Sequence, residues 1–251
     1  MPRTLYAGFG KQNDTFASQT RDAGAVLILP DERSFRYTLN DATAEVAANL
    51  YQAALPIANH ENRACDVARA VGAVAISATL GATAATVDLY QEGIIHVNDA
   101  AGEGYAHRIR RARVASDAHA SVLSSGIITV NLAAGESVQV ALTTSSEVSF
   151  HHNRHRVVLI HDSPPTAVLV GVSPGVAAAS RWYYSQVGGI AACLVSGTVV
   201  IGDFCVPSAT VDGAVMPSAA FETDGPYVGI VAGLGNSTTD GEEVIVDLKI
   251  G

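Results

Sequence analysis

The sequence predicts an all-β protein in which an extended N-terminal arm precedes two small β-sandwich or β-barrel domains. From residue 71 onward, short runs of alternating or β-branched residues recur at intervals of about ten residues, for example GIIHVND at 93–99 and SVQVALTT at 137–144. Glycine and Asp-Gly pairs separate these runs, as expected for tight turns between strands. This spacing is typical of sandwiches and barrels rather than of alternating strands and helices.

Residues 1–70 have a less regular pattern, and we expect them to form an arm with short strands near 25–30 and 34–39. Residues 40–55 fit a short helix, because Asp41 can cap it and alanine favours it. An extended conformation fits this segment equally well, because the helix would present only a thin apolar stripe. The aromatic side chains of the arm are candidate contacts with a partner protein: Phe9, Phe16, Phe35 and Tyr37.

Two β domains follow the arm, the first at 71–163 and the second at 166–251. Pro164-Pro165 interrupts the strand pattern and is the best candidate for a linker between them. In the second domain, Gly188-Gly189 and Asp212-Gly213 mark turns between short strands, and no long helix fits.

The composition indicates a folded protein whose surface is partly covered in an assembly. Of the 251 residues, 48% are hydrophobic and only 16% are charged, below the ~25% that is usual for soluble domains. A net charge of −9 argues against nucleic acid as a partner. The N-terminus lacks the apolar stretch of a signal peptide, and the longest apolar run, residues 189–202, is too short to span a bilayer. We therefore expect a soluble protein without a membrane partner. The three cysteines are expected to be small buried hydrophobes: Cys65, Cys193 and Cys205.

The sequence HHNRH at 151–155, with His161 nearby, is the cluster that could bind a metal ion. In an extended strand, His151 and His152 face opposite ways, whereas His151 and His155 share a face about 13 Å apart. That distance is too long for two ligands of one ion. We expect a polar loop or strand end here, with no metal and no other cofactor.

The dense basic patch of the chain is RIRRAR at 108–113. Alternation in a strand places Arg111 and Arg113 on one face, with Arg108 and Arg110 on the other. A solvated strand edge, where charge discourages aggregation, fits this pattern. A salt-bridged contact with an acidic neighbour fits it as well, so the four arginines are candidate interface residues.

Catalytic signatures do not stand out in the chain. GEG at 102–104 lacks the strand-and-helix context of a phosphate-binding loop. The aromatic cluster at 182–184 (Trp-Tyr-Tyr) is interpreted as core or interface, with alternation burying two rings and exposing the third. We therefore predict that the protein is not an enzyme, and a β-barrel hydrolase is the enzymatic alternative.

The run SRWYYSQVGGIAACLVSGTVVIGDFCVPSATVDGAVMPSAAF, followed by PYVGIVAGLG and EEVIVDLKIG, resembles the small β modules of phage head decoration proteins. The earlier runs TLGATAATVDLYQEGIIHVNDAAGEGYAHRIRRA and VALTTSSEV look like capsid-accessory proteins of marine phages. LYQAALPIANHEN resembles the arm that leads into this module. The resemblance covers about two thirds of the chain and supplies no catalytic residues.

The resemblance implies a tailed-phage capsid decoration protein, also called a cement or head-stabilising protein. Such a protein would bind the major capsid protein on the outer surface of the virion and stabilise the shell by bridging capsomers. We expect a homo-oligomer or symmetry-related copies, located on the capsid exterior after synthesis in the host cytoplasm. The alternative is a phage tail or adhesin component whose β modules contact a host receptor.

Overall fold

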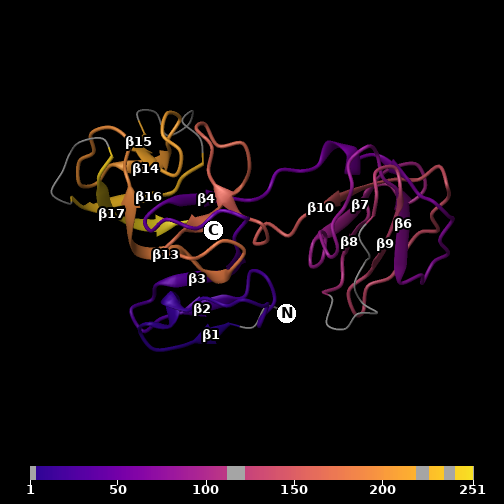
Figure 1. Cartoon of the computed structure of the whole chain (residues 1–251), viewed down its shortest axis with the longest axis horizontal. Helices are drawn as coiled ribbons and strands as arrows, with labels where there is room; N and C mark the ends of the chain where they lie inside the picture. Colours follow the sequence, from indigo (N-terminus) through magenta and orange to yellow (C-terminus); the bar gives the residue numbers. More distant parts are fainter. Residues whose placement is uncertain (1–3, 112–121, 219–225, 235–240, 251) are drawn as a thin grey trace. The chain divides into compact units, whose positions relative to one another are not determined.

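The computed structural model describes residues 4–111, 122–218, 226–234 and 241–250. It confirms the all-β class, since strands alternate with turns and loops throughout these residues (Figure 1). The described helical segments are two single 3₁₀ turns, Lys11–Asn13 (η1) and Ala58–His60 (η2). No helix in these ranges is long and apolar enough to cross a membrane.

The chain forms two compact units, each with its own hydrophobic core. Unit 1 combines Met1–Leu55 with Arg154–Gly251, and unit 2 comprises Pro56–Asn153. These boundaries differ from the expected ones, because the first 55 residues are not a separate arm and Pro164-Pro165 lies inside unit 1. The physical reason is long-range pairing: strands from the first 55 residues hydrogen-bond to strands that follow residue 158.

Unit 2 is a small six-stranded barrel. Its strands are β5 (Arg63–Ala64), β6 (Ala75–Thr79), β7 (Ile94–Asp99), β8 (Ala106–Arg108), β9 (Ile127–Asn131) and β10 (Glu147–His151). Four of them pair in the order β5-β10-β7-β8, and β6 pairs with β9. Single bridges, Cys65 to Ala78 and Ile109 to Leu132, join the two sheets at both edges and so close the barrel. Buried apolar side chains from all six strands or their flanking residues fill its interior.

Unit 1 contains an 11-stranded sheet. Its strands are β1 (Leu5–Tyr6), β2 (Val26–Ile28), β3 (Ser34–Leu39), β4 (Leu50–Gln52), β11 (Leu159–Ile160), β12 (Leu169–Val172), β13 (Trp182–Leu194), β14 (Phe204–Pro207), β15 (Val215–Pro217), β16 (Gly229–Gly233) and β17 (Glu243–Lys249). The main path is β1-β2-β3-β13-β17-β16-β14-β15, while β12 pairs with β13 and β4 lies between β11 and β12. Strands distant in sequence therefore share one sheet.

Strand β13 connects the two main cores of unit 1. Its first half pairs with β3 and its second half with β17. Trp182 and Tyr184 enter an aromatic core with residues of β2 and β3, where Trp182 stacks on Tyr37 at 4.9 Å between ring centroids. Tyr183 points to the opposite face and is buried against another cluster. All three rings are buried, not two as expected, because both faces of this half of β13 are covered.

Residues 40–55 do not form the helix that was one of the two conformations expected; they contain a bend at 42–43, a turn at 47–48 and the strand β4. They take part in a recurring arrangement that we call a loop pair. In a loop pair, two loops meet at a single antiparallel bridge. A further backbone hydrogen bond also joins the two loops. Its donor is the N–H three residues after one of the two bridge residues, and its acceptor is the carbonyl oxygen four residues before the other bridge residue. The bridges are Glu45–Ala177 in unit 1 and Arg69–Leu142 and Ala85–Val122 in unit 2. The corresponding N···O distances are 2.7 Å for Ser180 to Asp41, 2.8 Å for Gly72 to Val138 and 2.7 Å for Ser125 to Gly81.

Exposed apolar side chains accompany every loop pair. Seven of them lie within two residues of a bridge residue and are 38 to 82% exposed. We call these side chains the apolar tips: Val46, Val67, Val71, Val87, Leu123, Val140 and Val176. Unit 1 carries two of the apolar tips and unit 2 carries five, so both units expose apolar side chains to solvent.

Candidate functional site

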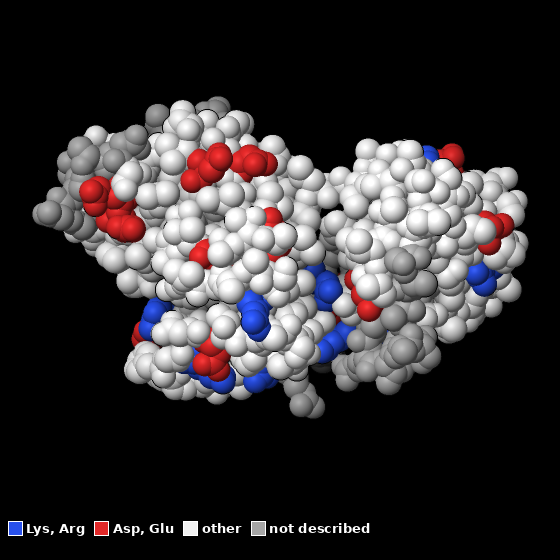
Figure 2. Space-filling view, in the orientation of Figure 1, with Lys and Arg blue, Asp and Glu red and all other residues white. Residues whose placement is uncertain are grey.

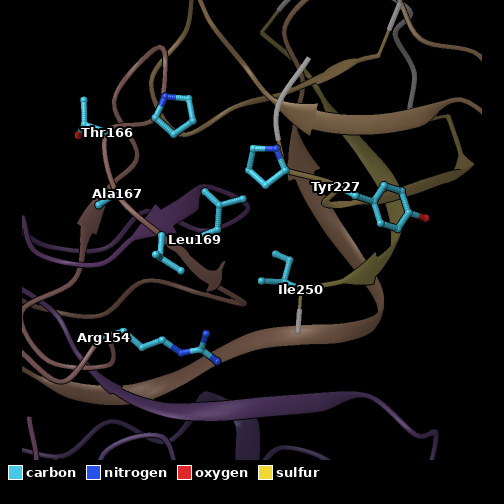
Figure 3. A pocket seen from close by; sticks show the side chains of 9 residues that line it. Arg154, Thr166, Ala167, Leu169, Tyr227 and Ile250 are labelled. Carbon is cyan, nitrogen blue, oxygen red and sulfur yellow. The ribbon is translucent and has the colours of Figure 1, made fainter. Parts of the chain in front are cut away.

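A pocket of about 570 Å³ opens on unit 1 and combines an apolar floor with a single cationic side chain. Figure 3 shows Leu169 and Ile250 at its centre, with Arg154 and Tyr227 on either side. Pro165, Thr166, Ala167, Val168 and Pro226 complete the lining. Sites that bind small molecules or side chains typically have this composition, in which apolar walls surround a few oriented polar groups.

One wall of the pocket, residues 162–167, is fixed by the amide of Gln52 on β4. This side chain is fully buried. Its Nε2 donates to Asp162 Oδ2 and Thr166 Oγ1, both at 2.9 Å, and its Oε1 accepts from the N–H groups of Thr166 and Ala167 at 3.1 and 3.3 Å. The amide thus uses both its donors and both its acceptor sites on one loop, which holds that wall in place.

The cationic side of the pocket carries an excess of positive charge. Burial, followed by the charge of Arg154, lowers the pKa of Arg36, and burial together with Arg154 and Arg36 lowers the pKa of His155 to about 3. Within the described part of the chain, neither Arg36 nor Arg154 forms an ion pair with an acidic side chain. Arg154 can therefore bind an anionic group in the pocket, and the apolar lining can contact an apolar segment that carries this group.

A buried acid lies at the loop pair of unit 1. Glu45 is 2% exposed, and burial raises the pKa of its carboxyl to about 8. Tyr51 and Tyr183 act on this pKa in the opposite direction. The hydroxyl of Tyr51 also accepts the backbone N–H of Val46 at 2.8 Å. With a pKa of about 8, the carboxyl of Glu45 is mostly protonated at pH 7. The sequence pattern does not indicate Glu45 as a site residue.

The four predicted aromatic contacts separate into core and surface. Phe35 and Tyr37 are fully buried in the aromatic core of unit 1, so their assignment to an interface is corrected. They are buried because β3 is an internal strand between β2 and β13. Phe16 is half-buried and contacts Tyr37 edge to face at 5.8 Å, while Phe9 is 66% exposed and stays a candidate contact.

The predicted arginine contacts lie on one edge of the barrel. Arg108 at the end of β8 and Arg110 are exposed on either side of the buried Ile109, as alternation predicts. Arg111 is half-buried, and Arg113 lies outside the described residues. These arginines belong to unit 2, whereas the predicted aromatic contacts belong to unit 1.

The histidines of 151–155 have separate surroundings. The His151 ring stacks on His96, the His152 ring packs on Tyr90, and His155 is buried in unit 1. His161 is fully buried, with its two ring nitrogens 2.7 Å from the carbonyl oxygens of Asp162 and Ala214. Among the described residues, no group of three or more His, Cys, Asp or Glu side chains is arranged to hold a metal ion.

The cysteines are buried and free, as the sequence predicts. Burial raises the pKa of Cys205 to about 12 and also raises the pKa values of Cys193 and Cys65. Thiols with raised pKa values hold little thiolate at neutral pH and are weak nucleophiles.

Sequence reasoning missed Gln52, Glu45 and Tyr227, which the structure places at the pocket or at the buried acid. The available signal was local: Glu45 and Gln52 are polar residues inside the alanine-rich segment 40–55. No family model matches the chain, and comparisons with curated proteins and with solved structures find no match either.

Proposed function

We propose that this protein is a structural virion protein that binds the outer surface of a phage capsid and stabilises the shell by bridging neighbouring capsomers. In this proposal it is not an enzyme, and its partners are the major capsid protein and further copies of itself. The resemblance of residues 71–251 to decoration proteins supports the assignment. A tail or adhesin role is the alternative, and it differs in where the protein is found on the particle.

The observation that carries the proposal is the placement of the apolar tips on both units. An exposed valine or leucine loses contact with water when a partner covers it, and each such contact adds to binding. Figure 2 shows that most of the visible surface of each unit carries neither basic nor acidic side chains. A low-charge surface with apolar tips is suited to a protein contact and poorly suited to nucleic acid.

Two separately packed units in one chain also favour bridging. Each unit has its own core and its own apolar tips, so each can contact a different neighbour. When one unit is bound, the other is held near the shell at a high effective concentration. Two weak contacts then give a strong attachment.

Binding of the purified protein to capsids that lack it tests the proposal. We expect saturable binding on the shell, seen by electron microscopy, and capsids that resist higher temperatures. Val176→Asp on unit 1 and Val71→Asp on unit 2 are each expected to lower occupancy at least tenfold, because a charge would be buried at the contact. Thr144→Asp, an exposed turn residue of unit 2, serves as the control and should bind like the native protein.

Density on tails and not on shells would favour the adhesin alternative. Unchanged occupancy in both valine variants would contradict the role of the apolar tips. All variants should first show the melting temperature of the native protein, since these positions are exposed.

Within this proposal, the pocket of unit 1 receives an acidic side chain or terminal carboxylate of the capsid protein, carried on an apolar segment. Arg154 would bind the carboxylate, and Leu169 and Ile250 would contact the apolar part. Arg154→Glu is expected to reduce capsid binding at least tenfold, because repulsion replaces attraction. Lys11→Glu, the same reversal at a half-buried residue of unit 1 that does not line the pocket, is the control. Equal loss in the two variants, measured by co-sedimentation at low salt, would indicate general attraction rather than a contact in the pocket.

A further inference from the structure

Two histidines, His96 and His151, lie against one another on the outside of the barrel. His96 lies on β7 and His151 on β10, and these strands are antiparallel neighbours (Figure 1). The Nδ1 atom of His96 and the Nε2 atom of His151 are 2.9 Å apart and form a hydrogen bond, in which either ring can be the donor. The two rings are stacked, with 4.9 Å between centroids and 21° between planes.

Strand register explains why these two rings meet. Ser149 pairs with His96, and His151 follows two residues later on the same face of the sheet, so the histidines are diagonal neighbours. The alternate residues of both strands, including Ile95 and Phe150, are fully buried in the barrel core. His96 and His151 therefore point outward, and both are half-buried, which leaves them accessible to a solute.

Two other histidines of unit 2, His60 and His107, have buried surroundings. His60 is fully buried and its ring nitrogens contact the Tyr90 hydroxyl and the carbonyl oxygen of Thr83. His107 is buried beside Glu136, at 3.4 Å from its carboxylate. Each of these has the environment of a structural core histidine. His96 and His151 differ because two imidazole nitrogens face one another at the surface.

We propose that His96 and His151 form a chelating site for a divalent transition-metal ion that prefers tetragonal coordination, Cu²⁺ or Ni²⁺. Two nitrogens that each lie about 2.1 Å from one ion are about 3.0 Å apart at a 90° angle and about 3.4 Å apart at a tetrahedral angle. The observed 2.9 Å matches the first value. Imidazole is a preferred ligand for copper and nickel, and water would occupy the remaining positions.

The surroundings of the pair support this assignment. A bound ion would displace the proton that the two rings share in their hydrogen bond. The negative charge of Glu61 acts on His151 and would favour a bound cation. Nearby, Ser149 donates to Asn98 Oδ1 at 3.0 Å, which ties β10 to β7 beside the histidines.

Titration of the full-length protein with NiCl₂, followed by calorimetry and by thermal unfolding, tests the site. We expect saturable binding and a higher melting temperature in Ni²⁺, because the ion binds the folded barrel and not the unfolded chain. His96→Asn and His151→Asn should each weaken binding at least tenfold and abolish the rise in melting temperature. His152→Asn removes the adjacent histidine and should leave both effects unchanged.

Two results would overturn the proposal. The first is Ni²⁺ binding of equal strength in the native protein and in both pair variants, which would place the ion elsewhere in the chain. The second is an equal response to MgCl₂, since Mg²⁺ prefers oxygen ligands and should not bind two imidazoles. With Cu²⁺, electron paramagnetic resonance should show two coordinated nitrogens in the native protein and one in either variant.

Discussion

We expect the native protein to lose stability between pH 6.5 and pH 8, and we expect the substitution Glu45→Gln to abolish this loss. The carboxyl of Glu45 is buried in unit 1, which raises its pKa from 4.5 to about 8. The folded state therefore keeps a proton that the unfolded state releases above pH 4.5. The stabilisation is fully present below pH 4.5 and is lost as the pH rises through 8.

The titration of His155 sets the pH range in which the effect of Glu45 on stability can be measured. Burial and the charges of Arg154 and Arg36 lower its pKa from 6.5 to about 3, so the unfolded state binds more protons below pH 6.5. Its contribution is fully present above pH 6.5 and is lost as the pH falls toward 3. Between pH 4.5 and 6.5 the two groups act in opposite directions, and from pH 6.5 to 8 Glu45 acts without that opposition.

The expected slope follows from 1.36 kcal/mol for each pH unit, which gives about 2 kcal/mol between pH 6.5 and pH 8. Urea unfolding at a series of pH values measures it. Glu45→Gln keeps the shape of the side chain and cannot ionise, so its free energy of unfolding should be flat over this range. Glu243→Gln, an exposed glutamate of β17, should keep the native slope. A Glu45→Gln variant with that same slope would show that Glu45 is not the responsible group.

Phe35→Ala is expected to lower the free energy of unfolding by about 3–5 kcal/mol, the usual cost of removing a buried aromatic ring. Phe35 is fully buried in the aromatic core, on a strand flanked on both sides. Its loss leaves a cavity between β2, β3 and β13 that the paired backbone cannot collapse to fill. A change of this size can unfold much of unit 1, since whole domains are stable by only about 5–15 kcal/mol.

Phe9→Ala is the matched control, because it makes the same change at a ring that is 66% exposed. Its effect on stability should stay within about 0.5 kcal/mol. Denaturant unfolding compares the two variants directly, and equal effects would contradict the division of these residues into core and surface. If Phe9 contacts a capsid, Phe9→Ala will instead lower occupancy on the shell without changing the unfolding curve.

The sequence by itself determined the all-β class. Period-two runs and glycine turns are local features, and the strands at 93–99 and 34–39 follow from them. The burial of Cys65, Cys193 and Cys205 also followed from residue type alone. The expectation that His151 and His155 are too far apart to bind one ion came from the rise of an extended backbone, about 3.3 Å per residue.

Tertiary structure alone decided which strands share a sheet. Residues 1–70 look like an arm because their runs are short and irregular, yet β3 becomes an internal strand when β13 pairs with it across about 150 residues of sequence. That pairing buries Phe35 and Tyr37 and covers both faces of Trp182 to Tyr184. Local periodicity cannot encode a partner so far away in the chain.

The candidate sites depend on the same long-range contacts. Gln52 reaches residues 162–167, Glu45 meets Ala177, and His96 meets His151 only after the strands have paired. The segment of sequence around each of these side chains does not indicate which distant residue it meets. The sequence therefore determines the strands and turns from local preferences, whereas the pocket, the buried acid and the histidine pair arise because folding brings distant segments together.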